Sequence, residues 1–162
     1  MAEKILVKWQ NNFSIGIKLI DDQHKELIRL TNKLFVSCLA GRERSMDVFL
    51  DTIHDVVDYT SYHFTTEEKV MERVNYPEYF KHKSEHVDFV REVYDRVAEF
   101  EPGKIVAPIK FVYFLRDWVL HHIAMSDRKM GEYLMNLSRS GELHTTILKV
   151  KKDAVSNRMQ IC

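Results

Sequence analysis

The sequence predicts an all-α protein: an up-down-up-down four-helix bundle with an N-terminal arm and a C-terminal extension. Hydrophobic residues fill 45% of the 162 positions, and only five glycines and three prolines interrupt them. Apolar residues recur at spacings of three and four along four long segments, which is the pattern of amphipathic helices. Short links join these segments, as in bundles of antiparallel helices. A chain of this length is about the size of one domain and can bury a core.

The first expected helix lies in "IDDQHKELIRLTNKLFVSCLAG", residues 20–41. Asp21 or Asp22 is its candidate cap, and Gly41 is a stop signal because glycine readily ends a helix. The second expected helix runs over residues 45–74 and ends before "NYP". This motif marks a boundary because the residue before a proline disfavours helical backbone angles.

The third and fourth expected helices cover residues 77–100 and 108–137. The motif "EPG" follows the third helix, and "SRSG" follows the fourth. Both motifs are typical of loops. A proline begins each helix, where its missing N–H group leaves no helical hydrogen bond unmade.

Two terminal segments lie outside the four helices. Residues 1–19 lack a helical cap but carry four large apolar side chains, so we expect an ordered arm across the bundle: Trp9, Phe13, Ile15 and Ile17. Residues 138–162 form a possible fifth amphipathic segment, but their Thr and Val content disfavours a helix, and their structure stays open. We therefore predict a bundle with its arm over residues 1–137 and an extension over residues 138–162.

Each expected helix carries metal-capable side chains within its apolar series. His63 and Glu67 are four residues apart and continue the inward series from Val56 to Val70. The same reasoning applied to all four helices gives the set His24, His63, Glu67, His82, His86, His122 and Asp127. The remaining histidines lie on charged faces or in the extension, so we expect no ligand among His54, His121 and His144.

Burying five histidines and two carboxylates without partners would be costly. Each unpaired buried polar group costs about 1–3 kcal/mol, so seven would cost on the order of 10 kcal/mol, comparable to the stability of a whole domain. Five neutral imidazoles offer one donor and one acceptor each and would have to interlock across four helices. A metal centre satisfies all seven groups together, and we predict one.

The ligand types restrict the metal. Imidazole with a minority of carboxylates suits iron, copper, zinc or nickel, and the absence of cysteine argues against a closed structural zinc site. Seven ligands exceed the needs of one ion. Two ions bridged by both carboxylates would take three histidines on one ion and two on the other, leaving one position open for a small molecule. Cys38 and Cys162 fit no metal or disulfide spacing and receive no role.

Charge and hydropathy exclude several partners. Lys and Arg together number 24, as do Asp and Glu, so no charge excess exists to hold nucleic acid or an anionic membrane. No run of about 18 apolar residues occurs, and the N-terminus lacks the apolar stretch of a signal peptide. We expect a cytoplasmic location, and the sequence indicates no particular protein partner.

Four motifs resemble the hemerythrins, the non-haem di-iron oxygen carriers, and specifically their bacterial branch. They are "FSIGIKLIDDQHKEL" (13–27), "HFTTEE" (63–68), "HKSEH" (82–86) and "WVLHHIAMSD" (118–127). The similarity spans about residues 9–135, and the motifs follow one another in the family's order. Up-and-down four-helix bundles include members of this family, so the resemblance implies the same fold that the apolar periodicity predicts.

The resemblance implies roles for individual residues. It assigns one iron to His82, His86 and His122 and the oxygen-binding iron to His24 and His63. Glu67 and Asp127 would bridge the two irons together with a solvent-derived oxo or hydroxo group. Leu27, Phe64, Trp118 and Val119 would wall an oxygen pocket.

The implied function is reversible binding of molecular oxygen, as a carrier or store and not as an enzyme. Two alternatives stay open. One is an oxygen or redox sensor that signals to a partner through the bundle or the extension. The other is a di-iron enzyme, such as a peroxidase, oxidase or nitric oxide scavenger. A carrier releases its oxygen, a sensor changes shape or partner, and an enzyme turns over.

Overall fold

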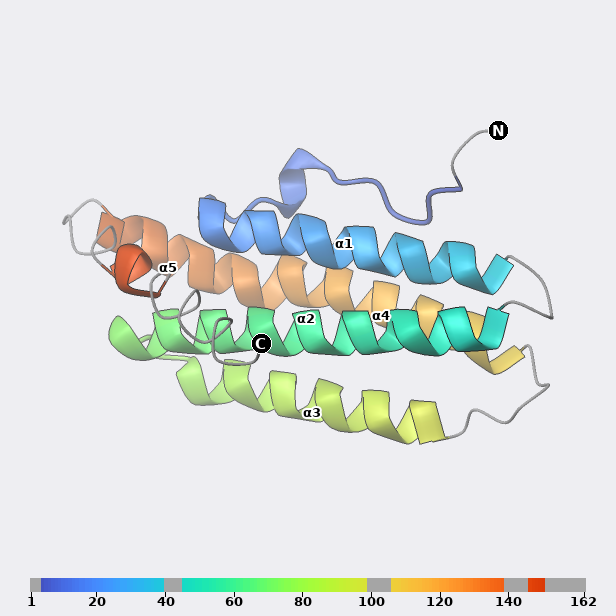
Figure 1. Cartoon of the computed structure of the whole chain (residues 1–162). Helices are drawn as coiled ribbons and strands as arrows, with labels where there is room; N and C mark the ends of the chain where they lie inside the picture. Colours follow the sequence, from blue (N-terminus) through green and yellow to red (C-terminus); the bar gives the residue numbers. More distant parts are fainter. Residues whose placement is uncertain (1–3, 40–44, 99–105, 139–145, 151–162) are drawn as a thin grey trace.

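The computed structural model describes residues 4–39, 45–98, 106–138 and 146–150, and it is the helical bundle that the sequence predicts (Figure 1). Successive helices of the bundle run in alternating directions, and the arm lies along the outside of the first helix. The elements, in order, are η1 (Asn11–Phe13), α1 (Lys18–Leu39), α2 (Ser45–Arg73), α3 (Tyr79–Ala98), α4 (Val106–His122), η2 (Ile123–Asp127) and α5 (Arg128–Ser138).

The apolar core consists of two clusters of buried side chains. α1 packs against α2 and α4, and α2 also packs against α3. The larger cluster draws side chains from all four bundle helices, among them Leu34, Phe49, Phe89 and Leu115. The second cluster lies towards α5 and includes Ile20, Val70, Met130 and Leu134. Along α1, the predicted ligand His24 lies between Ile20 of the second cluster and Leu27 of the larger one, so it is placed where the two clusters meet.

The start of α1 differs from the prediction. The helix begins at Lys18, and the Ile17 carbonyl accepts the N–H groups of Ile20 and Asp21. Asp21 is not a cap of its own helix. Its carboxylate accepts the Ser14 hydroxyl at 2.6 Å and the Ile15 N–H at 2.8 Å. The aspartate therefore fastens the arm to α1, because the arm offers donors that would otherwise be buried unpaired.

The helix breaks at "NYP" as predicted, and Asn75 contributes to the break as well as Pro77. Asn75 adopts a left-handed backbone with φ 51°. The Tyr76 N–H donates to the Met71 carbonyl, and the Asn75 N–H donates to the Glu72 carbonyl. These two bonds form a Schellman motif, with Tyr76 and Met71 in the same apolar cluster.

The fourth predicted helix is not one continuous α-helix. A π-helical segment, η2, separates α4 from α5, and the Arg128 N–H donates to the Ile123 carbonyl five residues earlier. The wider turn changes the helical phase for the residues that follow it. Strict α-helical spacing from His122 would place Met125 on the inward face, but after the wider turn it is 49% exposed.

The two ends pack on the bundle where they are described. Gly131 leaves space for the arm, since a Cβ atom there would lie 2.7 Å from the Ile15 Cβ. Residues 146–150 are helical, and Val150 is buried in the second apolar cluster. Gly41 and His144 lie outside the described residues. The division at residue 137 stays a prediction. None of the helices in the described ranges combines the length and apolarity that a membrane crossing requires.

Candidate metal centre

All seven predicted ligands are buried and converge on one region of the bundle. α1 supplies His24, α2 supplies His63 and Glu67, and α3 supplies His82 and His86, one turn apart. His122 is the last residue of α4, and Asp127 is the last residue of η2. Every bundle helix thus contributes to the site, as expected from the inward polar positions.

Glu67 divides its two carboxylate oxygens between two groups of histidines. Its Oε1 atom lies 3.5 Å from His63 Nε2 and 3.8 Å from His24 Nε2. Its Oε2 atom lies 3.3 Å from His86 Nε2 and 3.5 Å from His82 Nε2. One carboxylate therefore faces both groups, with a different oxygen towards each.

Asp127 divides its oxygens in the same way. Its Oδ2 atom lies 3.1 Å from His24 Nε2. Its Oδ1 atom lies 3.1 Å from His122 Nε2 and 3.2 Å from His82 Nε2. The π-helical segment makes this approach possible, because residues five apart in an α-helix point about 140° away from each other.

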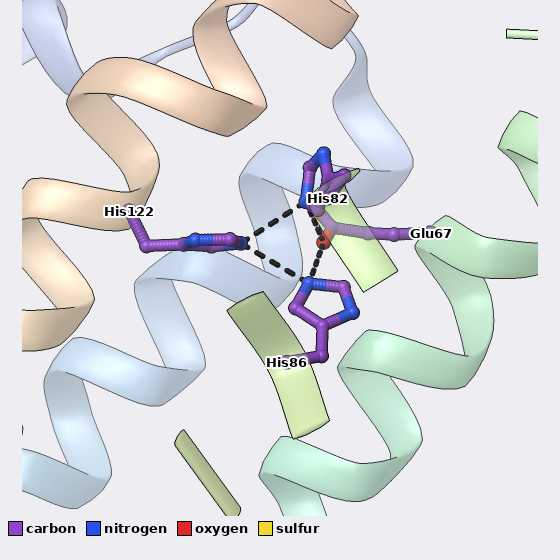
Figure 2. A group of neighbouring side chains, drawn as sticks. All are labelled: Glu67, His82, His86 and His122. Atoms are coloured by element: carbon purple, nitrogen blue, oxygen red, sulfur yellow. Dashed lines mark hydrogen bonds and ion pairs between the residues drawn. The ribbon is translucent and has the colours of Figure 1, made fainter. Parts of the chain in front are cut away.

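Three histidines converge through their Nε2 atoms with Glu67 among them (Figure 2). His122 Nε2 lies 3.0 Å from His82 Nε2 and 3.1 Å from His86 Nε2. Each ring nitrogen of a neutral imidazole either donates or accepts a hydrogen bond. Three such nitrogens that meet at one point therefore need an additional proton or a cation between them. The second group consists of His24, His63, Glu67 and Asp127.

Three further residues support the histidines from behind, and the sequence reasoning missed them. Gln23 Oε1 lies 3.0 Å from His63 Nδ1, and Glu68 Oε1 lies 3.1 Å from His86 Nδ1. Glu85 Oε2 lies 3.3 Å from His122 Nδ1. The sequence offers one signal that could have identified them, because each supporting residue directly neighbours a predicted ligand. Gln23 is next to His24, Glu68 is next to Glu67, and Glu85 is next to His86.

The ion-free site attracts protons. Burial opposes a charged imidazole, but Asp127 and Glu67 raise the pKa of His24 to about 9 and that of His82 to about 10. Burial likewise opposes charge on His122, and Asp127 raises its pKa to about 9. Burial lowers the pKa of His63 to about 4. Asp127 and Glu67 thus stabilise positive charge in this region.

The donor set fits metal ions. In the described part of the chain, seven buried side-chain atoms lack a hydrogen-bond partner: both ring nitrogens of His24, both oxygens of Glu67, both oxygens of Asp127 and His82 Nδ1. Two groups of four residues, sharing Glu67, each place one potential ligand atom per residue within 4.8 Å of the others. Cations that take nitrogen and oxygen ligands would bind these atoms. Without such cations, each unpaired buried atom would lower the stability of the fold.

The predicted oxygen-pocket residues belong to the apolar surroundings of this region. Leu27, Phe64 and Val119 are buried in the main cluster, and Trp118 is partly buried against it. The Phe64 ring stacks on His86 with centroids 3.7 Å apart, and the Trp118 ring stacks on His122 at 4.4 Å. Two of the four residues therefore contact histidines of the three-histidine group directly.

The histidines that we expected not to be ligands differ from the seven predicted ligands in their burial. His54 and His121 are exposed and belong to neither candidate metal group among the described residues. His121 neighbours the buried His122, so one step along the helix separates surface from centre. This contrast reflects the rotation of about 100° per residue in an α-helix.

Comparisons with known proteins agree with this geometry. A bacteriohemerythrin of Stenotrophomonas maltophilia is 32% identical over 127 residues, which cover 78% of this chain and 80% of the relative. A bacteriohemerythrin of Pseudomonas aeruginosa is 33% identical over 143 residues, covering 83% of this chain and 91% of the relative. A crystal structure of a hemerythrin mutant is similar with a TM-score of 0.68 and 27% identity, covering 80% of this chain and 97% of that chain.

A sequence profile of the Hemerythrin HHE cation binding domain matches residues 15–134. The match includes all four bundle helices, η2 and most of α5. It also includes both groups of residues that are able to hold a metal. The chain belongs to the hemerythrin family.

Proposed function

We propose that the protein reversibly binds molecular oxygen at a pair of non-haem irons, as a carrier or store. The observation that carries the proposal is the division of Glu67 and Asp127 between two histidine groups. Such carboxylates would bridge two ions, together with a solvent-derived oxo or hydroxo group. The similar proteins named bacteriohemerythrin and hemerythrin support the same proposal.

The two groups offer unequal numbers of ligands. His82, His86 and His122 would hold one iron, and His24 and His63 would hold the other. The second iron would have one protein ligand fewer, which leaves room for a small molecule. When bound, the iron pair would supply reversible exchange of electrons with oxygen. The protein's part is to hold the ligands on four different helices and to orient their rings through the supporting contacts behind them.

Apolar side chains around the site support binding over irreversible oxidation. Leu27 and Val119 are each 4% exposed, and Phe64 is 5% exposed. A site enclosed by such side chains restricts the access of water and of the protons that water carries. We propose that this restriction lets oxygen leave again unchanged.

One observation favours a sensor as the second candidate. Val150 in the extension is buried in the cluster that contains Ile20 and Val70. These two residues lie about one helical turn from His24 and Glu67, respectively. A change at the ligands would reach the extension through this contact, and a partner that binds the extension would detect it.

Iron stoichiometry and oxygen uptake test the proposal. After anaerobic loading with Fe(II) and removal of free metal, we expect two irons per chain and uptake of one oxygen molecule per pair. One zinc per chain with no iron retained would contradict the centre. Continued oxygen consumption with added reductant would indicate an enzyme, and oxygen-dependent exposure of residues 146–150 to a protease would indicate a sensor.

A further inference from the structure

Three supporting residues connect neighbouring helices in a repeated pattern. Gln23 on α1 contacts His63 on α2, Glu68 on α2 contacts His86 on α3, and Glu85 on α3 contacts His122 on α4. Each supporting residue neighbours a predicted ligand on its own helix. A helix thus offers one side chain to the metal centre and an adjacent one to a ligand of the following helix.

The supporting groups differ in charge between the two metal groups. In the three-histidine group, His86 and His122 each face a carboxylate through Nδ1. In the two-histidine group, His63 faces the neutral amide of Gln23. In the described part of the chain, one histidine of each group, His24 and His82, has an Nδ1 atom without a hydrogen-bond partner. Both supporting carboxylates therefore serve one side of the centre.

Neighbouring residues hold both carboxylates in place. Lys83 Nζ lies 2.9 Å from Glu68 Oε2, which leaves Oε1 directed at His86. The Ser126 hydroxyl donates to Glu85 Oε2 at 2.5 Å, and Ser126 belongs to η2. Glu85 thereby also fastens the π-helical segment that carries Asp127. These contacts fix the carboxylates before any metal binds.

We propose that Glu68 and Glu85 are positioning residues that make the three-histidine group the tighter-binding and more easily oxidised of two ion positions. A carboxylate that accepts a hydrogen bond from the Nδ1–H group fixes the tautomer whose Nε2 atom is free. It also makes that Nε2 atom a better metal ligand. Negative charge beside one ion also favours its higher oxidation state. The amide of Gln23 fixes the tautomer of His63 without adding this charge. The inference rests on the proposed two-ion centre.

Controlled removal of Co(II) tests the inference without using oxygen. The full chain is loaded with two equivalents of Co(II), and a competing chelator removes them while visible absorption reports the remaining ions. In the wild type we expect two separate dissociation constants. In the double variant Glu68→Gln, Glu85→Gln the tighter constant should weaken by about 10- to 100-fold. The weaker constant should stay within about twofold of wild type, because the substitutions leave the contact between His63 and Gln23 unchanged.

Two further variants separate a local effect from a general one. Glu72→Gln removes one charge from the exposed face of α2 and should change neither constant. Gln23→Glu gives His63 a carboxylate and should tighten the weaker constant, so that the two values approach each other. In the iron-loaded chain, the double variant should raise the reduction potential of one iron, which a loss of packing alone would not do selectively.

Several results would overturn the inference. Unchanged constants in the double variant would show that the carboxylates do not act on their histidines. An equal rise of both dissociation constants would show that the carboxylates act on the fold as a whole. A Gln23→Glu variant with an unchanged or weaker second constant would also contradict it. A wild type that holds fewer than two Co(II) ions would contradict the proposed centre itself, and the inference with it.

Discussion

His122 Nε2 lies 3.1 Å from Asp127 Oδ1, although the two residues are five positions apart on one helical segment. In a regular α-helix this spacing would turn them about 140° apart. The π-helical turn over Ile123–Asp127 widens the helix and returns Asp127 to the side of His122. Over a spacing of five positions, the π-helical turn thus brings the second carboxylate to the centre.

The π-helical turn can be tested by changing its length. Deletion of the exposed Ala124 leaves the histidine and the aspartate four positions apart, which places them on one face of an α-helix. We expect this variant to retain two ions per chain. Insertion of an alanine after Ala124 moves the aspartate to a spacing of six and should lower the content to one ion or none. Metal analysis of both variants after Fe(II) loading provides the measurement.

The adjacent pair His121 and His122 tests the helical phase. His122→Ala removes a ligand of the three-histidine group and should abolish the pair of ions or leave one weak ion. His121→Ala changes an exposed side chain and should leave the iron content and optical spectrum near those of the wild type. His54→Ala should be equally silent. Equal iron loss in the His121 and His122 variants would show that the assigned phase is wrong.

The ion-free protein should be less stable at alkaline pH than at neutral pH. The folded-state pKa values of His24, His82 and His122 are about 9, 10 and 9, above the ordinary value of 6.5. The folded chain therefore binds more protons than the unfolded chain between about pH 6.5 and pH 10. This stabilisation is fully present below about pH 6.5 and is lost as the pH rises through the folded-state values.

Melting curves of the ion-free chain between about pH 7 and pH 10 measure this loss as a falling Tm. The metal-loaded chain should show a much smaller fall, because the ions replace the protons. Metal uptake at about pH 7 should accordingly release protons, which a weakly buffered titration detects. A Tm of the ion-free chain that stays constant over this range would contradict the assigned proton binding.

Polar substitutions in the apolar surroundings should speed irreversible oxidation. Leu27→Gln or Val119→Asn would admit water near the centre and should raise the autoxidation rate severalfold with two irons retained. Each should also cost about 1–3 kcal/mol of stability if the new polar group stays unpaired. Val36→Asn on the exposed face of α1 serves as the control. Autoxidation at the wild-type rate in both buried variants would show that Leu27 and Val119 do not limit the autoxidation rate.

Much of this architecture follows from spacing in the sequence. The helical series placed His63, Glu67 and His122 inside because apolar residues flank them at intervals of three and four. The start of α1 was predicted incorrectly, since the local sequence does not reveal that Asp21 serves the arm. The same limit applies to the supporting contacts, because they join residues on different helices.

The π-helical segment shows a second limit. Periodicity assumes about 3.6 residues per turn throughout a helix, so a wider turn shifts every later position, and the apolar pattern alone does not reveal it. Unbroken periodicity would place Met125 inside, three residues after His122, but its side chain is exposed. The five-residue spacing of His122 and Asp127 is the available hint, since both carry metal-capable groups and neither fits the other's α-helical face.

Repeated oxygenation of the reduced, iron-loaded wild-type chain tests the central claim most directly. The optical spectrum is recorded anaerobically, after one equivalent of oxygen, and again after oxygen is removed under vacuum. We predict a new absorption spectrum with oxygen, its disappearance under vacuum, and recovery of the same amplitude over several cycles. Irreversible conversion to the ferric form in the first cycle, without an oxygen-bound spectrum, would contradict reversible oxygen binding.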